Sequence, residues 1–144
     1  GDTKEGGIIT VRVNPQMNAS NETGKIENAF GGINENETWG KKAHWCDYSG
    51  VVDGTSVGVA VFDHLSNPRS PTYWHVRNYG LMGSNIFGGG TFEEDKSKDG
   101  SYTLQSGAQM DFRFRVYIHA GDATQGNVGQ RYHDFINPPD VVAS

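Results

Sequence analysis

The sequence predicts an all-β fold, an antiparallel β-sandwich with one short helix near the carboxy terminus. Three features support this prediction. The 20 glycines indicate many turns, and the 7 Phe, 6 Tyr and 3 Trp suit strands better than helices. Several segments alternate apolar and polar residues, as half-buried strands do, and long apolar runs with helical spacing are scarce. The length of 144 residues fits a single domain over residues 1–144, with one core.

The first elements follow from this alternation. A strand is expected within residues 7–13, because Ile9, Val11 and Val13 would share one face. Residues 14–24 are turn formers and predict an exposed loop. The chain thus opens almost directly on a strand, and we expect it to be a fragment of a longer domain.

The middle of the chain predicts a series of strands. A short strand near residues 25–30 is followed by a polar loop, and the alternation of residues 41–48 predicts the next strand. Asp53-Gly54 lies between apolar runs and predicts a tight hairpin. Residues 55–62 are small and apolar, which is typical of a strand covered on both faces. A further short strand is expected over residues 76–82.

The longest regular element is expected over residues 108–119. One face of this strand would carry Met110, Phe112, Phe114, Val116 and Ile118, and the other Asp111, Arg113, Arg115, Tyr117 and His119. The second face either faces solvent or forms the floor of a cleft, because a strand holds side chains firmly enough to build a site. A short helix is then expected over residues 124–136.

Residues that suit ligand binding are dense in the loop after residues 55–62. The planar guanidinium groups of arginine bind carboxylates or sugar hydroxyls, and aromatic rings stack on pyranose faces. The alternative is that these aromatic residues pack in the core and the arginines hold the loop. The predicted substrate-binding residues are Asn67, Arg69, Trp74, Arg77, Tyr79, Asn85, Arg113 and Arg115.

Candidates for proton transfer are His64, His75, His119 and, as a partner base, Glu5. Asp63 precedes His64, but adjacent strand residues point to opposite faces, so Asp63 either orients His64 through a bulge or caps the following turn. The histidines lack the spacing of a local metal site, so a metal would have to be held across strands, with His64 and either His75 or His119. We therefore predict no metal and no cofactor.

Charge and composition limit the partners. The net charge of −5 and the scattered basic residues argue against nucleic acid, which needs a clustered basic face. The sequence has no apolar run of the roughly 20 residues that span a membrane, so a soluble chain is expected. Cys46 is the only cysteine and leaves the compartment open; a periplasmic or extracellular location is favoured over a cytoplasmic one.

Several motifs resemble those of a known family. They are Asp2-Thr-Lys-Glu-Gly6, Trp39-Gly, Trp45-Cys-Asp-Tyr-Ser-Gly50, Ser66-Asn-Pro-Arg69, Pro71-Thr-Tyr-Trp-His-Val-Arg77 and Phe114-Arg-Val-Tyr-Ile-His-Ala-Gly121. Over roughly residues 2–135 the chain resembles the carboxy-terminal half of the bacterial methane oxygenase PmoA-like proteins, the DUF6807 domain family. The resemblance implies a β-sandwich related to sugar mutarotases, a missing amino-terminal half, and a setting of sugar degradation.

Two classes of function follow from these expectations. The first is a carbohydrate-active or carbohydrate-binding domain, whose ligand is a saccharide or another small molecule. The second is a noncatalytic structural or assembly module, in which sheet edges pair with neighbouring chains or with further copies of this chain. A metal-dependent oxygenase, which the family label suggests, is the least favoured.

Overall fold

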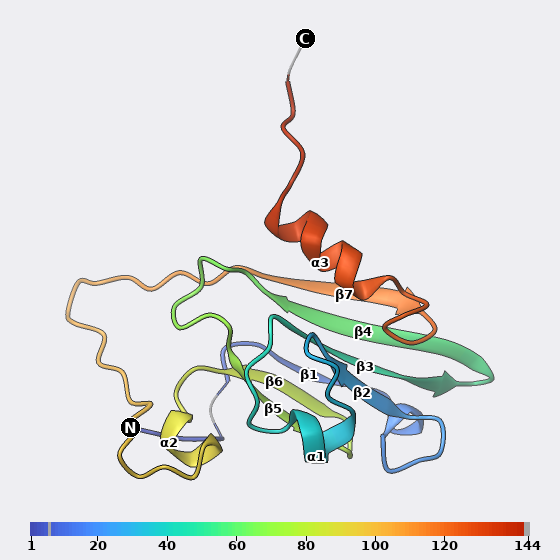
Figure 1. Cartoon of the computed structure of the whole chain (residues 1–144), viewed down its shortest axis with the longest axis horizontal. Helices are drawn as coiled ribbons and strands as arrows, with labels where there is room; N and C mark the ends of the chain where they lie inside the picture. The colour runs from blue at the N-terminus through green and yellow to red at the C-terminus, as the bar shows by residue number, and fades with distance from the viewer. Residues whose placement is uncertain (6, 143–144) are drawn as a thin grey trace.

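Two antiparallel sheets are the main regular elements of the computed structural model, which describes residues 1–5 and 7–142 (Figure 1). The three-stranded sheet has the order β1 (Thr10–Arg12), β6 (Leu81–Asn85) and β5 (Tyr73–Arg77). The four-stranded sheet has the order β2 (Lys25–Asn28), β3 (Trp45–Val52), β4 (Thr55–Asp63) and β7 (Phe114–Ala120). The helices of the described residues are η1 (Pro15–Met17), α1 (Asn34–Thr38), α2 (Gly89–Phe92) and α3 (Val128–Ile136). The predicted β-rich fold with a short C-terminal helix is confirmed at this level.

One hydrophobic core lies between the two sheets. The four-stranded sheet contributes Ile26, Cys46, Tyr48 and Val61, and the three-stranded sheet contributes Trp74, Val76 and Met82. Trp74 is wholly buried there, and its indole Nε1 donates to the carbonyl oxygen of Ala43 at 2.9 Å. Because side chains alternate along a strand, Tyr73, His75 and Arg77 must project from the outer face of the three-stranded sheet.

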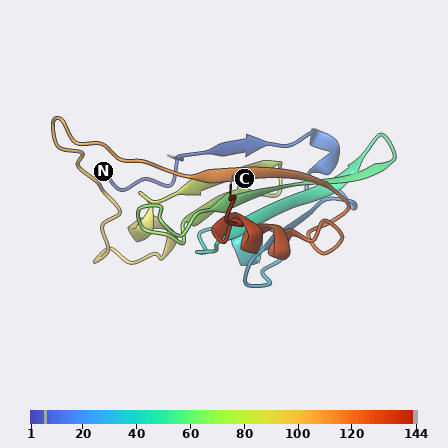
Figure 2. The same ribbon diagram turned by 90° about the horizontal axis from the view of Figure 1, so that it is seen from above.

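A second apolar cluster lies on the other face of the four-stranded sheet. Ala60 and Phe62 of β4 pack there against Val128, Tyr132 and Phe135 of α3. These helix residues follow the i, i+4, i+7 spacing of an amphipathic helix. The second apolar cluster confirms that this segment has one buried face. Figure 2 shows α3 and β1 on opposite sides of β7.

The predicted hairpin at Asp53-Gly54 joins β3 to β4. Both turn residues have positive φ, 49° at Asp53 and 79° at Gly54, and Val52 pairs with Thr55 across the turn. A turn with positive φ at both central positions matches the twist of the flanking strands. The Asp-Gly pair therefore sets the register of the longest strand pair in the fold.

Four predictions about elements were wrong. Residues 76–82 are not one strand, because a turn ending at Gly80 (φ 93°) separates β5 from β6. Residues 108–113 are not in a strand: Phe114 already pairs with Asp63, the last residue of β4, so the chain before it has no strand to join. Helix α1 forms in the segment after β2 that was expected to be a polar loop, and β3 begins at Trp45 and not at residue 41.

Candidate functional site

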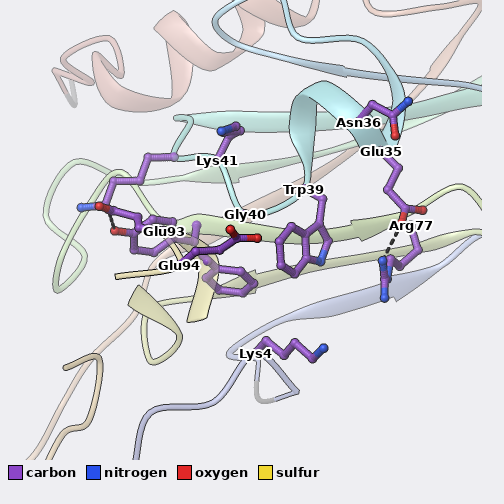
Figure 3. Close-up of a pocket in the computed structure, with 12 residues that line it drawn as sticks. Lys4, Glu35, Asn36, Trp39, Gly40, Lys41, Arg77, Glu93 and Glu94 are labelled. Atoms are coloured by element: carbon purple, nitrogen blue, oxygen red, sulfur yellow. Dashed lines mark hydrogen bonds and ion pairs between the residues drawn. The ribbon is translucent and has the colours of Figure 1, made fainter. Parts of the chain in front are cut away.

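A cleft of about 910 Å³ opens on the outer face of the three-stranded sheet (Figure 3). Its lining combines aromatic, basic and acidic side chains from four parts of the chain. They include Lys4, Glu35, Trp39, Lys41, Lys42, Tyr73, Arg77, Phe92, Glu93 and Glu94. This outer cleft has the size and the mixed lining of a small-molecule site.

Glu35 anchors one side of the outer cleft. Its carboxylate accepts from Arg77 Nη1 at 2.5 Å and from the backbone N–H of Asn78 at 2.8 Å. The Asn78 side-chain oxygen in turn accepts from the Glu35 N–H at 3.1 Å. Helix α1 is thereby fixed to the end of β5, and this fixes Trp39, which directly follows the helix.

Aromatic rings form the wall beside Arg77. The Trp39 ring packs edge-on against Phe92 and His75, with ring centroids 5.3 Å and 6.4 Å apart. The ring centroids of Tyr73 and Phe92 are 5.4 Å apart. The Tyr73 hydroxyl donates to Glu93. Burial and this contact with Glu93 raise the pKa of Tyr73 to about 12, so it remains a neutral donor.

Two hydrogen-bond donors in this wall lack acceptors. Among residues 1–5 and 7–142, nothing accepts from Trp39 Nε1 or Arg77 Nε, although both atoms are buried. Figure 3 shows the indole nitrogen of Trp39 on the side of the ring that faces Arg77, and the guanidinium carbon lies 5.7 Å from the ring centroid. A buried donor without a partner costs about 1–3 kcal/mol. An oxygen-rich ligand would recover this cost once a small shift of the two side chains opened these donors to the outer cleft.

His75 lies behind the aromatic wall and is nearly buried. Its Nδ1 lies 2.6 Å from the carbonyl oxygen of Lys4, and because a carbonyl only accepts, Nδ1 carries the proton. In this tautomer Nε2 carries the lone pair. A small cavity of about 90 Å³ is lined by both His75 and Glu5, with Thr10 and Gly83. Two of the predicted proton-transfer residues therefore lie beside one cavity.

Other predicted residues hold loops in place. Asn67 donates to Asp63 Oδ1 at 2.7 Å and bonds to the backbone of Arg113, so Asp63 stabilises its own turn and does not orient His64. Arg69 donates to three carbonyl oxygens, those of Ile86, Gly100 and Ser101. Asn85 is buried and bonds to the backbone of Thr3 and Phe87.

The remaining predicted residues do not line the outer cleft. Trp74 lies in the core, and Tyr79 is half exposed beneath Arg12. The ring centroids of His64 and Phe135 of α3 are 5.2 Å apart, and the Arg115 guanidinium lies over the same Phe135 ring. His119 lies in β7, and the exposed Arg113 directly precedes that strand. Of the predicted set, only Arg77 lines the outer cleft; Glu5 and His75 lie beside the small cavity, and the others hold loops, pack in the core or lie on other faces.

His119 forms a buried pair with Asp47 on the α3 side of the four-stranded sheet. His119 Nε2 lies 2.7 Å from Asp47 Oδ1, and the two side chains are 2% and 0% exposed. Burial raises the pKa of Asp47, and the hydrogen bond from His119 only partly offsets this. Burial disfavours the charged ring of His119, but the contact with Asp47 outweighs it and raises the pKa of His119.

The pair depends on Gly58, over which the His119 ring lies. A Cβ at Gly58 would stand 2.2 Å from His119 Cε1. We expect Gly58→Ala to lower the free energy of unfolding by about 1–3 kcal/mol through overpacking. Chemical denaturation measures this effect. The control is Gly129→Ala in α3, where a Cβ meets nothing within 4 Å; an equal loss in both variants would contradict the role assigned to Gly58.

The sequence analysis missed Trp39, Glu35 and Lys42 as residues of the site. Trp39 was noted only within a family motif, and Tyr73 only as one aromatic residue of a dense loop. The sequence could have indicated Trp39, because a tryptophan at the end of a polar, turn-forming segment is a candidate for a surface site. Their assembly depends on contacts between residues far apart in the chain, such as Glu35 with Arg77.

Within residues 1–5 and 7–142, no three His, Cys, Asp or Glu side chains are grouped so that they could hold a metal ion. In the same part of the chain, no helix has the length and apolar character needed to cross a membrane.

Comparison with known proteins identifies the family of the chain. The model of a family described as "Family of unknown function (DUF6807)" matches residues 1–133. The predicted DUF6807 domain is thereby confirmed; the match does not bear on the PmoA-like label or on a carboxy-terminal half. No curated protein and no solved structure matches the chain.

Proposed function

The chain belongs to DUF6807, a family of unknown function, and from the geometry of the outer cleft we propose that it binds a saccharide. The observation that carries the proposal is the pair of buried donors, Trp39 Nε1 and Arg77 Nε, which have no acceptor within the described residues. Saccharides present many oxygen acceptors on a partly apolar ring. Such a ligand satisfies donors and covers aromatic surface at the same time.

The lining of the outer cleft supports this ligand class. Trp39 and Tyr73 offer aromatic surface, and Arg77 offers a planar fork held in place by Glu35. Rigid placement matters, because a side chain that is already fixed loses little entropy on binding. The two-sheet fold is also consistent with a β-sandwich of the mutarotase-like or jelly-roll-like kind, which we include in the proposal.

Proton transfer at His75 extends the proposal to a sugar-processing enzyme. The bond from Nδ1 to the Lys4 carbonyl orients the ring and leaves Nε2 to take up or release a proton. Glu5, beside the same small cavity, is the proposed partner base. His64 and His119 lie on the α3 side, so we give them no part in this step.

The test is binding of purified protein to a library of saccharides, followed by calorimetry on those that bind. We expect at least one saccharide to bind the wild-type protein. Turnover of glycosides and keto-sugars is measured in parallel, and His75→Ala should abolish it while leaving the protein folded, with His64→Ala as the control. Failure of the wild-type protein to bind any saccharide would overturn the proposal.

An assembly module is the second candidate, favoured by strand β7. This strand lies at the edge of the four-stranded sheet, and Val116 and Ile118 are 46% and 77% exposed on its apolar face. Exposed apolar edge strands pair with other chains. Sedimentation over a range of concentrations distinguishes this candidate, since it requires a second copy to bind. The oxygenase suggested by the family label ranks last, and elemental analysis of the purified protein tests it.

A further inference from the structure

A second cavity of about 360 Å³ adjoins the outer cleft. Lys42 and Tyr73 line both, so the two hollows meet at the Tyr73 side chain. Beyond Tyr73 the second cavity is lined by Arg69, Lys98 and Asp99, among others. A ligand that fills both hollows must cross Tyr73 and is therefore longer than one that fills the outer cleft alone. We call the two together the joined cleft.

Basic residues are concentrated in the joined cleft. It holds six of the twelve basic residues of the chain but only four of the seventeen acidic ones, although the whole chain has a net charge of −5. The basic residues are Lys4, Lys41, Lys42, Arg69, Arg77 and Lys98. A cleft whose charge is opposite to that of the rest of the surface concentrates ligands of the other sign.

Three of these positive charges form no direct ion pair in the described residues, although Lys42 lies near enough to Glu93 to help lower the pKa of that carboxyl. In the part of the chain that the structure describes, Lys41, Lys42 and Arg69 form no ion pair. The Arg69 guanidinium is held by three carbonyl oxygens, which fix its position and leave its charge in place. Lys42 Nζ lies 4.9 Å from the centroid of the Tyr73 ring, at the junction of the two hollows.

Most of the acidic groups of the joined cleft are already engaged. Glu35 bonds to Arg77 and Asn78, and Glu93 bonds to Tyr73 and Lys98. Asp99 accepts from the N–H and the hydroxyl of Ser101. Because these carboxylates already have partners, the unpaired cations are available to an incoming anionic group.

We propose that the joined cleft takes an acidic saccharide of at least two units, with a carboxylate or sulfate group bound beyond Tyr73 near Lys42 and Arg69. This inference rests on the proposed saccharide binding and specifies its ligand class. Trp39, Tyr73 and Arg77 contact the uncharged part of the saccharide. The charged group is bound by the cations of the second cavity.

Matched pairs of saccharides test the inference. The panel holds di- and trisaccharides of galacturonic, glucuronic and mannuronic acid with their methyl esters, and sulfated galactose disaccharides with their desulfated forms. Binding is measured by calorimetry at low salt and at 0.5 M salt, where charges are screened beyond about 4 Å. We expect the acidic members to bind about tenfold more tightly at low salt, with the difference largely lost at high salt.

Two variants locate the effect. Lys42→Gln should weaken binding of the acidic members about threefold and leave the neutral members unchanged, as expected for one partly exposed charge. Arg131→Gln removes the charge of an exposed side chain on α3 instead. It should change the binding of neither the acidic nor the neutral members. The uronate and sulfate arms show which anionic group is preferred.

The outcomes separate the two proposals. Equal binding of acidic and neutral members overturns the inference and leaves saccharide binding standing. Absence of binding by every member and by the wider saccharide library overturns both. An acidic preference that survives Lys42→Gln and high salt unchanged also contradicts the inference, because the charges would then lie elsewhere.

Discussion

His119→Ala is expected to lower the free energy of unfolding by about 3–5 kcal/mol, because it leaves the carboxylate of Asp47 buried without its partner. The pair has no access to water that could compensate, since the two side chains are 2% and 0% exposed. Asp47 Oδ2 is also buried without a partner among residues 1–5 and 7–142. Urea denaturation of the variant and the wild-type protein measures the loss.

A double-mutant cycle separates the interaction energy of the pair from the stability lost through packing alone. In Asp47→Ala/His119→Ala no buried charge is left behind, so the loss should be smaller than the sum of the two single losses. Additive losses would contradict the pairing. A loss below about 1 kcal/mol in His119→Ala would show that the pair does not stabilise the fold.

The same pair predicts how stability depends on pH. The folded-state pKa of His119 is raised above 6.5, and that of Asp47 is raised above 3.8. In both cases the native state holds its proton more tightly than the unfolded state, so stability falls as pH rises through the folded pKa values. For His119 the contribution is complete below pH 6.5 and is lost above it. His119→Gln should remove the part of this loss of stability that occurs above pH 6.5.

Trp39→Ala is expected to weaken saccharide binding about 30-fold or more, as truncation of a central aromatic anchor does in other binding sites. The variant loses both ring surface and the Nε1 donor. Phe30→Ala is the matched control, because Phe30 is an exposed aromatic residue that does not line the outer cleft. Calorimetry measures the affinities and circular dichroism confirms folding. Equal losses in both variants would contradict the location of the site.

Much of the four-stranded sheet could be predicted from local patterns. Asp53-Gly54 specifies its own turn, and the apolar residues of β4 require cover on both faces. Residues 108–113 have the same alternation as β7 but form no strand, because β4 ends where Phe114 pairs with Asp63. Alternation shows that a segment can be a strand, but only the neighbouring chain decides whether it becomes one.

The site was less predictable than the fold. Density of functional residues pointed to the stretch from Asp63 to Tyr79, yet Trp74 packs in the core and its neighbours Tyr73 and His75 face outward. Alternation separates such neighbours but does not say which of them is buried. The outer cleft also needs Trp39 and Phe92, which reach β5 only through the fold.

The most direct test of the account is calorimetry of Trp39→Phe with the saccharide that binds the wild-type protein most tightly. Phenylalanine keeps an aromatic ring and removes a donor that has no acceptor in the described residues. We predict that the free energy of unfolding does not fall by more than about 1 kcal/mol, because the variant also removes an unsatisfied buried donor, while affinity falls about tenfold, because the donor bonds only to the ligand. Wild-type affinity in Trp39→Phe would contradict the claim that this donor binds the saccharide.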